Sequence, residues 1–332
     1  MLNILITAGG TSEKIDDVRR ITNTGTGALG AKVAEAFAET PVESGEGRYI
    51  VYICSERAVR PRVAEQGGGS PEQGETSERG EGSAVQSDTL AQGGSASAPG
   101  DALEQGGAPA PGDVSLSECK IEVRVADDVR AVEAAVRRAC AETSFDIIVH
   151  SMAISDYQVR AVSDADLIAQ VAAERLSALK SGDPTTGVAS VAVIAHEVRE
   201  ALLSPPGLGE AKISSDKENL VVILEKAPKV ISLLRGLAPG AVVVGFKLLS
   251  GAYERALVGA AHALLEKNDC DFVLANDMKT VSAAGSGTGS DAHEGLLVAR
   301  DGTYERALGK DAIAALIVRR ATEAFLRQEQ KR

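Results

Sequence analysis

Two glycine-rich segments near the N-terminus have the residue types that hold an anion. Gly9 and Gly10 follow an apolar run at residues 2–7 and precede Thr11. The second segment, residues 25–30, reads GTGALG, a GxGxxG spacing that leads into a run with helical periodicity. Glycines let the backbone approach a ligand closely, and the N-terminus of a helix favours negative charge. The two segments therefore indicate a phosphate or carboxylate site beside the end of the first strand.

A nicotinamide dinucleotide is an alternative ligand for the second segment. The dinucleotide fingerprint places GxGxxG directly after the strand, whereas here the insert SEKIDDVRRITNT lies between the strand and the glycines. Short-chain dehydrogenases also carry a Tyr and a Lys four positions apart, but Tyr157 is followed at that distance by Ala161. An NAD(P)-dependent oxidoreductase stays an alternative, as does a regulatory module that binds a nucleotide without catalysis.

The insert itself carries charged and amide side chains: Asp16, Asp17, Arg19, Arg20 and Asn23. The fork of an arginine suits a phosphate or a carboxylate, so these residues are candidates for substrate binding. The same acids and bases could instead pair with one another on a solvated face. The sequence leaves both interpretations open.

Later apolar runs also end in polar groups. Asp156 follows the run at 145–151, Phe246 and Lys247 end the run at 241–248, and Asn276 follows the run at 271–275. The segments KISS and KAPK add Lys212 and lysines on both sides of Pro228, although a surface position is the ordinary alternative for a lysine. Open α/β sheets bind ligands where their strands end. We therefore expect these groups to face one cleft.

Strand-like and helical patterns alternate along most of the chain. Strands are predicted at 2–7, 48–54, 120–125, 145–151, 220–225, 241–248 and 271–275, and helices at 28–39, 127–142, from 229 onward, at 253–267 and at 310–328. A hairpin turning at Asp301-Gly302 precedes the last helix. This alternation predicts an α/β fold, a three-layer, mostly parallel Rossmann-like sheet with a C-terminal β-hairpin. The stretch up to about residue 211 reads as irregular.

Residues 64–118 differ in composition from the rest of the chain. They are rich in Gly, Ser, Pro, Ala and Glu and contain almost no large apolar residue. Such a segment cannot bury enough surface to offset the entropy of ordering it. We predict a long disordered insertion at 64–118 within a single nucleotide-binding domain formed by residues 1–63 and 119–332.

Composition limits the classes of function. The 332-residue chain has a net charge of −12, 3% aromatic residues and no Trp, so binding to nucleic acid is not expected. It has no apolar run of membrane-spanning length and does not begin with a signal-peptide pattern, so a cytoplasmic protein without membrane contact is expected. The four Cys and four His lack metal-binding spacing, and no metal held by protein side chains is predicted.

The motifs, taken in order, resemble those of the phosphopantothenate–cysteine ligases (phosphopantothenoylcysteine synthetases), most closely the stand-alone bacterial form. The matching segments are ITAGGT, DDVRRITNTGTGALG, AISDY, KISS, KAP, VGFK and LAND. Each is weak alone, but their order is specific. The resemblance spans the chain except residues 64–118 and much of 160–205.

The resemblance implies a ligase, unrelated to the ATP-grasp enzymes, that joins 4′-phosphopantothenate to L-cysteine in coenzyme A biosynthesis. The carboxylate attacks the α-phosphorus of CTP, or of ATP, giving an acyl-nucleotide (acyl-cytidylate) that cysteine then consumes. Mg²⁺ accompanies the triphosphate, and a homodimer is expected. The implied catalytic residues are Asn23, Lys212 and Arg19, with Arg19 gripping phosphopantothenate from the neighbouring subunit. Substrate contacts would come from Arg19, Asn23, Met152, Ala153 and Asp156, and nucleotide contacts from Gly9, Gly10, Thr11, Gly25, Gly27, Gly30, Asp156, Lys212, Pro228, Lys229, Val230, Ile231, Phe246, Lys267 and Asn276.

Two positions depart from the family pattern. Many bacterial members carry a second lysine one helical turn before Lys267, where this chain has Ala263 beside His262. The family's SSGKMG segment is GTGALG here, which removes a lysine at position 28. Lys247 or His262 could replace the missing charge, and both departures bear on binding strength more than on the type of reaction.

Overall fold

A computed structural model describes residues 1–40, 47–62, 119–180, 190–208, 212–279 and 293–331. The chain divides into one unit of Met1–Val63 with Leu116–Arg332 and a second of Ala64–Ser115. The second unit, and with it the predicted disordered insertion at 64–118, lies outside the described residues.

The centre of the first unit is an eight-stranded sheet with the order β12-β11-β10-β9-β6-β1-β4-β5. Six neighbouring strands from β5 to β10 are parallel, and β11 and β12 form an antiparallel hairpin at one edge. This is the predicted mostly parallel Rossmann-like sheet, with the predicted C-terminal hairpin. The strands are β1 (Leu2–Ala8), β4 (Arg48–Cys54), β5 (Cys119–Val125), β6 (Ile147–His150), β9 (Val242–Leu249), β10 (Phe272–Asp277), β11 (Glu294–Ala299) and β12 (Tyr304–Leu308).

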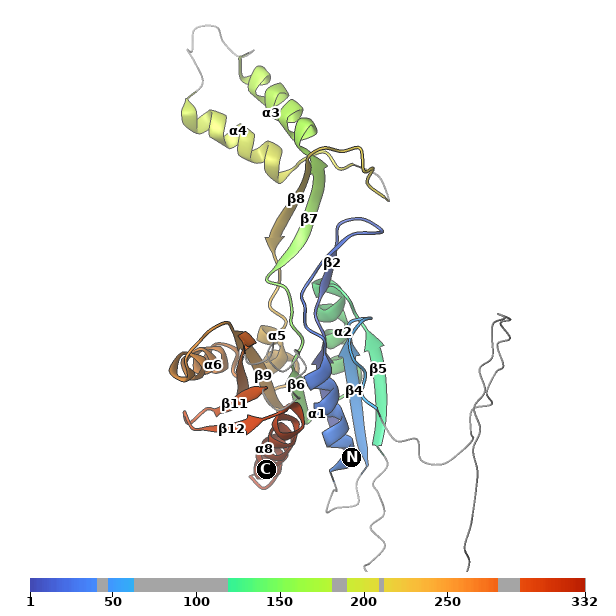
Figure 1. Cartoon of the computed structure of the whole chain (residues 1–332), viewed down its shortest axis with the longest axis vertical. Coiled ribbons are helices and arrows are strands. Elements are labelled where there is room, and N and C mark those ends of the chain that lie inside the picture. Colours follow the sequence, from blue (N-terminus) through green and yellow to red (C-terminus); the bar gives the residue numbers. More distant parts are fainter. Residues whose placement is uncertain (41–46, 63–118, 181–189, 209–211, 280–292, 332) are drawn as a thin grey trace, which may run out of the picture. The chain divides into compact units, whose positions relative to one another are not determined.

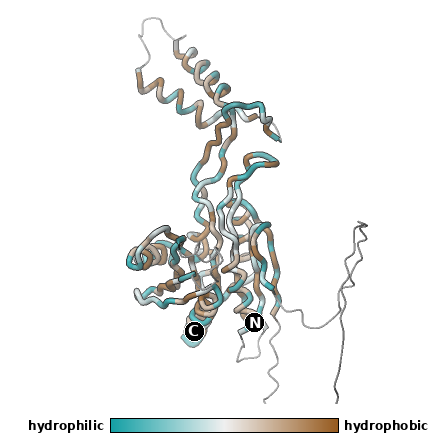
Figure 2. The backbone as a smooth tube through the Cα atoms, in the orientation of Figure 1, coloured by the Kyte–Doolittle hydropathy of each residue, from teal (hydrophilic) through white to brown (hydrophobic). Residues whose placement is uncertain are grey.

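Helices cover both faces of the sheet because alternate side chains of each strand point to opposite faces. Ile4 and Ile6 of β1 belong to the core that packs on α1 (Ala28–Glu39) and α8 (Lys310–Glu329). Leu5, from the same strand, belongs to the core on the other face, with α2 (Val129–Glu142), α5 (Ile231–Leu237) and α6 (Glu254–Asn268). Figures 1 and 2 show these helices and the hydrophobic strands between them. The three-layer prediction is confirmed.

The prediction that the stretch to about residue 211 is irregular is wrong. It contains β7 (Tyr157–Asp164), α3 (Ala165–Lys180) and α4 (Val191–Leu203), and β7 pairs with β8 (Leu220–Lys226) as an antiparallel ribbon. Within the described residues the ribbon has two strands, and few of its side chains are buried. β7 lacks the continuous apolar run of a central strand, whereas β8 begins with the apolar run LVVIL and corresponds to the strand predicted at 220–225. Of the helix α4, only Ala201 is buried. Weak burial left little periodic signal in this part of the sequence.

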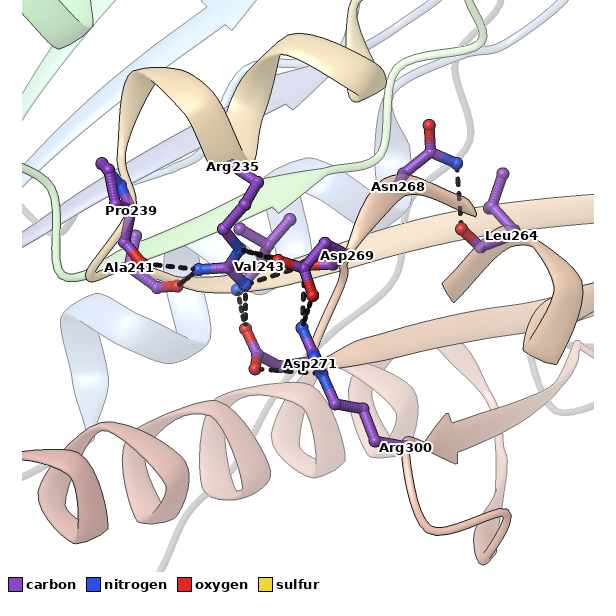
Figure 3. Close-up of polar contacts among 9 residues, drawn as sticks. All are labelled: Arg235, Pro239, Ala241, Val243, Leu264, Asn268, Asp269, Asp271 and Arg300. Carbon is purple, nitrogen blue, oxygen red and sulfur yellow. Dashed lines mark hydrogen bonds and ion pairs between the residues drawn. The ribbon is translucent and has the colours of Figure 1, made fainter. Parts of the chain in front are cut away.

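The strand starts of β9 and β10 are tied together by one arginine (Figure 3). Arg235, near the end of α5, donates to the backbone carbonyls of Pro239, Ala241 and Asp269 and to the carboxylate of Asp271. That carboxylate also accepts from the backbone N–H of Val243 at 2.8 Å. The network provides hydrogen-bond donors for the backbone carbonyls that follow α5 and α6. It holds together the amino-terminal ends of β9 and β10, at the edge of the sheet away from the carboxyl ends of the strands.

Candidate functional site

A cleft of about 510 Å³ opens where β1, β6, β9 and β10 end. Its walls also include the first turn of α1, the start of α5, the middle of α6 and the starts of β11 and α8. Parallel strands present their carboxyl ends at one edge, so segments far apart in the sequence meet here. The cleft is lined by Gly9, Gly25, Thr26, Gly27, Ala28, Leu29, Gly30, His150, Ser151, Met152, Ala153, Ile154, Asp156, Lys229, Val230, Ile231, Phe246, Lys247, Leu248, Leu264, Asn276, His293 and Lys310.

One wall is the N-terminus of α1. Gly27 precedes the helix with φ +75, a left-handed conformation that suits glycine, and the hydroxyl of Thr26 accepts from the N–H of Ala28 at 3.4 Å. The first N–H groups of a helix have no partners within it, and they carry the positive end of the helix dipole. This wall can therefore accept an anionic group.

A second wall carries positive and polar side chains. Lys247 and Lys310 line it, and neither forms an ion pair within the described part of the chain. The Nδ2 of Asn276 lies 3.2 Å from the Nε2 of His293, whose Nδ1 is buried and has no hydrogen-bond partner among the described residues. Burial, and then the charge of Lys310, lower the pKa of His293. At the rim, Lys229 forms an ion pair with Asp156.

A neutral histidine lies between these two walls. His150 ends β6, is buried, and places its Nδ1 2.8 Å from the hydroxyl oxygen of Thr7 in β1. Burial lowers the pKa of His150 to about 4, so the ring is uncharged at neutral pH. Beside it, the hydroxyl of Ser151 donates to the carbonyl of Thr7 at 2.7 Å.

The structure brings twelve of the predicted site residues together as the lining of this cleft. They are Gly9, Gly25, Gly27, Gly30, Met152, Ala153, Asp156, Lys229, Val230, Ile231, Phe246 and Asn276. They come from six elements or their ends and span most of the chain. The expectation that the polar groups after β6, β9 and β10 face one cleft agrees with this geometry.

Gly10, Thr11 and Asn23 lie directly behind the lining. Gly10 forms a backbone bridge with Ala153, and the N–H of Thr11 donates to the carbonyl of Ala153 at 3.1 Å. The side-chain amide of Asn23 donates to the same carbonyl at 3.0 Å. These residues hold the loop that follows β6 in place.

Arg19 and Lys212 lie outside the cleft: Arg19 forms an ion pair with Asp16 at 3.3 Å, and Lys212 is the residue before Ile213. Both adjoin Asp16, whose carboxylate accepts from the backbone N–H groups of Val18, Arg19 and Ile213. Burial acts to raise the pKa of Asp16, but these N–H groups and the nearby Arg19 together hold it below its usual value. Arg19 also donates to the carbonyl of Ile213 at 3.4 Å. Lys212 is exposed.

The remaining predicted residues, Pro228 and Lys267, are exposed and do not line the cleft. Of the two candidates to replace the missing family lysine, Lys247 lines the cleft. His262 does not, and its Nδ1 lies 3.5 Å from the carboxylate of Glu266 in the same helix. The geometry favours Lys247.

Sequence reasoning did not select several lining residues. His150 and Ser151 end a buried strand, and this position is a signal that could have found them. Lys310 and His293 come from α8 and from the start of β11, and they reach the cleft only through the packing of the final hairpin and helix. No local pattern marks those two residues.

Two further observations concern metals and membranes. Within the described ranges, no three His, Cys, Asp or Glu side chains gather as a metal site. In the same ranges, no helix has the length and apolar character needed to cross a membrane.

Relatives of known sequence point to coenzyme A biosynthesis. The chain is 24% identical over 299 residues to the coenzyme A biosynthesis bifunctional protein CoaBC of Thermococcus kodakarensis, covering 90% of this chain and 45% of that protein. It is 35% identical over 69 residues to the CoaBC of Methanocaldococcus jannaschii, covering 21% of this chain and 17% of that protein. The chain thus spans less than half the length of these relatives.

Solved structures share the fold. The DNA/pantothenate metabolism flavoprotein of Streptococcus pneumoniae superposes with a TM-score of 0.60 at 23% identity, covering 98% of this chain and 100% of that one. A Cab2 mutant in complex with phosphopantothenate-cysteine superposes with a TM-score of 0.53 at 14% identity, covering 99% and 88%.

The sequence profile of the DNA/pantothenate metabolism flavoprotein C-terminal domain matches residues 1–44 and 202–325. These two ranges make up half of the chain. They contain β1, the glycine-rich start of α1, and the strands and helices from β8 to α8 that build the cleft. The chain therefore belongs to the family of the DNA/pantothenate metabolism flavoprotein C-terminal domain.

Proposed function

We propose that this protein is a phosphopantothenate–cysteine ligase that forms phosphopantothenoylcysteine through an acyl-nucleotide. The observation that carries the proposal is one cleft lined by the first turn of α1 together with Lys247 and Lys310. Membership of the family and its CoaBC relatives support the same activity.

The chemistry requires this kind of electrostatic environment. A carboxylate must approach a triphosphate, and both are anions, so the site has to supply positive charge and backbone donors. The first turn of α1 supplies backbone N–H groups to the cleft, and Lys247 and Lys310 supply positive charge to it. Once the α-phosphorus has been attacked and pyrophosphate has left, cysteine displaces the nucleotide from the acyl carbon.

Individual residues have distinct roles in this proposal. Phe246 and the loop from Met152 to Asp156 form the pocket for the nucleoside, and the Asp156–Lys229 ion pair at the rim contacts the base or ribose. Asn23 uses one amide hydrogen on Ala153 and has a second for the acyl oxygen. CTP is the proposed nucleotide, with ATP as its competitor, and Mg²⁺ would bind through the triphosphate oxygens.

Arg19 and Lys212 take part from a second subunit in this proposal. Both adjoin Asp16, outside the cleft of their own chain. In a homodimer this cluster would reach the cleft of the partner and neutralise phosphate charge there. The half-exposed Arg19, which is paired with Asp16, and the exposed Lys212 would supply this charge.

The test is a reconstituted reaction with phosphopantothenate, L-cysteine and Mg²⁺, with CTP, ATP or NADPH as the third substrate. The proposal expects pyrophosphate release that requires phosphopantothenate, together with a product of the mass of phosphopantothenoylcysteine. Nucleotide binding without pyrophosphate release would contradict it in favour of a regulatory module. NADPH oxidation without pyrophosphate would contradict it in favour of an oxidoreductase.

A further inference from the structure

His150 is placed at the floor of the cleft by the sheet itself. It is the last residue of β6, and it pairs in register with Thr7 of β1 and Gly245 of β9. The next residue, Ser151, packs beneath Gly30 in the first turn of α1. His150 is 6% exposed and lines the cleft. The proposed reaction does not yet use this ring.

The second ring nitrogen of His150 is open to the cleft. Nδ1 contacts the hydroxyl of Thr7 at 2.8 Å, whereas Nε2 has no hydrogen-bond partner within the described part of the chain. Nε2 of His150 is not fully buried, in contrast to Nδ1 of His293, which is buried and has no partner among the described residues. The exposed edge of the ring is therefore its Nε2.

The hydrogen bonds of Thr7 determine which nitrogen carries the proton. Thr7 is fully buried, and its hydroxyl oxygen already accepts from the N–H of Met152 at 3.5 Å. Its own proton needs an acceptor, because a buried donor left without one destabilises the fold. Among the described residues the acceptor is Nδ1 of His150. If Thr7 donates to Nδ1, the neutral ring carries its hydrogen on Nε2.

The charges around the ring keep it neutral. Burial is the cause that lowers the pKa of His150 to about 4. The titratable groups that line the cleft are Lys247 from β9, Lys310 from α8, His293 from β11 and the paired Asp156 and Lys229 at the rim. The carboxylate of Asp156 is paired with Lys229, so the two other lysines leave the lining with a positive balance that disfavours a second proton on His150.

We propose that His150 is a neutral hydrogen-bond donor whose Nε2–H contacts the acyl oxygen of the bound substrate. This inference rests on the proposed function and adds a residue to it. A neutral imidazole donates to a carbonyl oxygen without giving up its proton, and it stabilises the oxyanion that forms when the carbonyl is attacked.

The atoms balance without a proton transfer through the ring. The amine nitrogen of cysteine forms the new C–N bond, and the bond from the acyl carbon to the phosphate oxygen breaks. The electron pair of that bond leaves with the nucleoside monophosphate, and the surplus proton of the amine passes to solvent. The hydrogen bond from Nε2–H to the acyl oxygen strengthens while that oxygen carries negative charge. It weakens again when the carbonyl re-forms.

The direct test is ¹⁵N NMR of the histidine-labelled full-length protein. The chain has four histidines, so the His150 signals can be assigned by their loss in the H150Q variant. The proposal expects a neutral ring protonated at Nε2 that does not titrate between about pH 5.5 and about pH 8.5. A ring protonated at Nδ1, or one that titrates in this range, would overturn it and indicate a general base.

Activity provides the second measurement. H150L, which removes the donor, should lower kcat by roughly 10²-fold with a smaller change in KM, and H150Q, which can return an N–H near Nε2, should recover part of the loss. T7V removes the hydroxyl that orients the ring and should lower kcat, whereas T7S retains it and should not. Circular dichroism and the unfolding midpoint identify variants that fail to fold.

The two proposals fail in different ways. If the wild-type protein releases no pyrophosphate with any nucleotide, the ligase proposal fails, and the NMR result still reports the state of the ring. If the wild-type protein is an active ligase but H150L keeps its kcat, or T7V and T7S behave alike, the role of His150 is refuted while the ligase assignment stands.

Discussion

Gly30 offers a sharp test of how the N-terminus of α1 is positioned. A Cβ atom at residue 30 would lie 2.6 Å from the Cβ of Ala8 and 2.6 Å from the hydroxyl oxygen of Ser151. That hydroxyl cannot simply retreat, because it donates to the carbonyl of Thr7 at 2.7 Å. Gly259, in α6, is exposed, and a Cβ there would have no neighbour within 4 Å. The same Gly→Ala change should therefore have opposite effects at the two positions.

The magnitudes follow from two competing contributions. Replacing Gly by Ala inside a helix stabilises it by about 1 kcal/mol, while forcing a methyl group into a packed site costs about 1–3 kcal/mol. Displacing Ser151 would also weaken a hydrogen bond of about 1 kcal/mol. Gly30→Ala should lower the free energy of unfolding by about 1–2 kcal/mol, or Tm by about 2–8 °C. Gly259→Ala should raise that free energy by about 0.5–1 kcal/mol.

Urea unfolding of both variants measures these values, and calorimetric titration with CTP measures the effect on the site. Gly30→Ala should also weaken nucleotide binding, because relief of the clash shifts the first turn of α1, whereas Gly259→Ala should leave binding unchanged. Adding Ser151→Ala to Gly30→Ala removes one of the two close contacts and should restore part of the stability. Equal stability changes at positions 30 and 259 would refute the packing argument.

Three other substitutions test separate parts of the molecule. Arg235→Leu should lower the free energy of unfolding by about 2–3 kcal/mol, because three carbonyls and a carboxylate each lose one donor, although Arg300 still donates to the Asp269 carbonyl and Val243 to the Asp271 carboxylate. Arg327→Leu, a control with an exposed side chain, should change it by less than about 0.5 kcal/mol in urea unfolding. Asp16→Asn should loosen the segment at Ile213, measured by amide hydrogen exchange. Since the pKa of Asp16 is lowered below 3.8, its contribution is present above that pH and is lost as pH falls through the lower folded value, and the D16N variant should lack this dependence. Asn23→Ala should slow cysteine transfer more than pyrophosphate formation in single-turnover assays, and an equal decline of both steps would contradict the acyl-oxygen role.

The sequence predicted the central strands because burial on both faces produces continuous apolar runs. Ile147–His150 is buried at every position, and such a run has no other plausible place in a soluble fold. The two glycine-rich segments were also visible, since close backbone approach restricts the residue type. β7 and α4 gave little signal because they bury few side chains, whereas the apolar start of β8 predicted a strand at 220–225. His293 could not be found because its position in the cleft depends on how the final hairpin packs, which no local spacing encodes.

The insert between β1 and α1 decides what the GxGxxG segment can do. Its two short strands, β2 (Ser12–Lys14) and β3 (Arg20–Thr22), pair as a hairpin that returns the chain to the end of β1. The two glycine-rich segments, which are separated in the sequence, are therefore adjacent in the structure: a Cβ at Gly25 would lie 2.9 Å from the carbonyl oxygen of Gly9.

The glycines of the two adjacent segments allow close contact between backbone and backbone. A Cβ at Gly10 would lie 2.3 Å from the carbonyl oxygen of Asn23, so Gly10 and Gly25 are each closed by backbone of the other segment. In a dinucleotide turn the corresponding close approach is made by the pyrophosphate of the cofactor. Here the first turn of α1 lines the cleft beside Gly9 and Gly25. A helix end of this kind can hold one anionic group at the floor of a cleft, which suits a triphosphate or a carboxylate better than a dinucleotide lying across the turn.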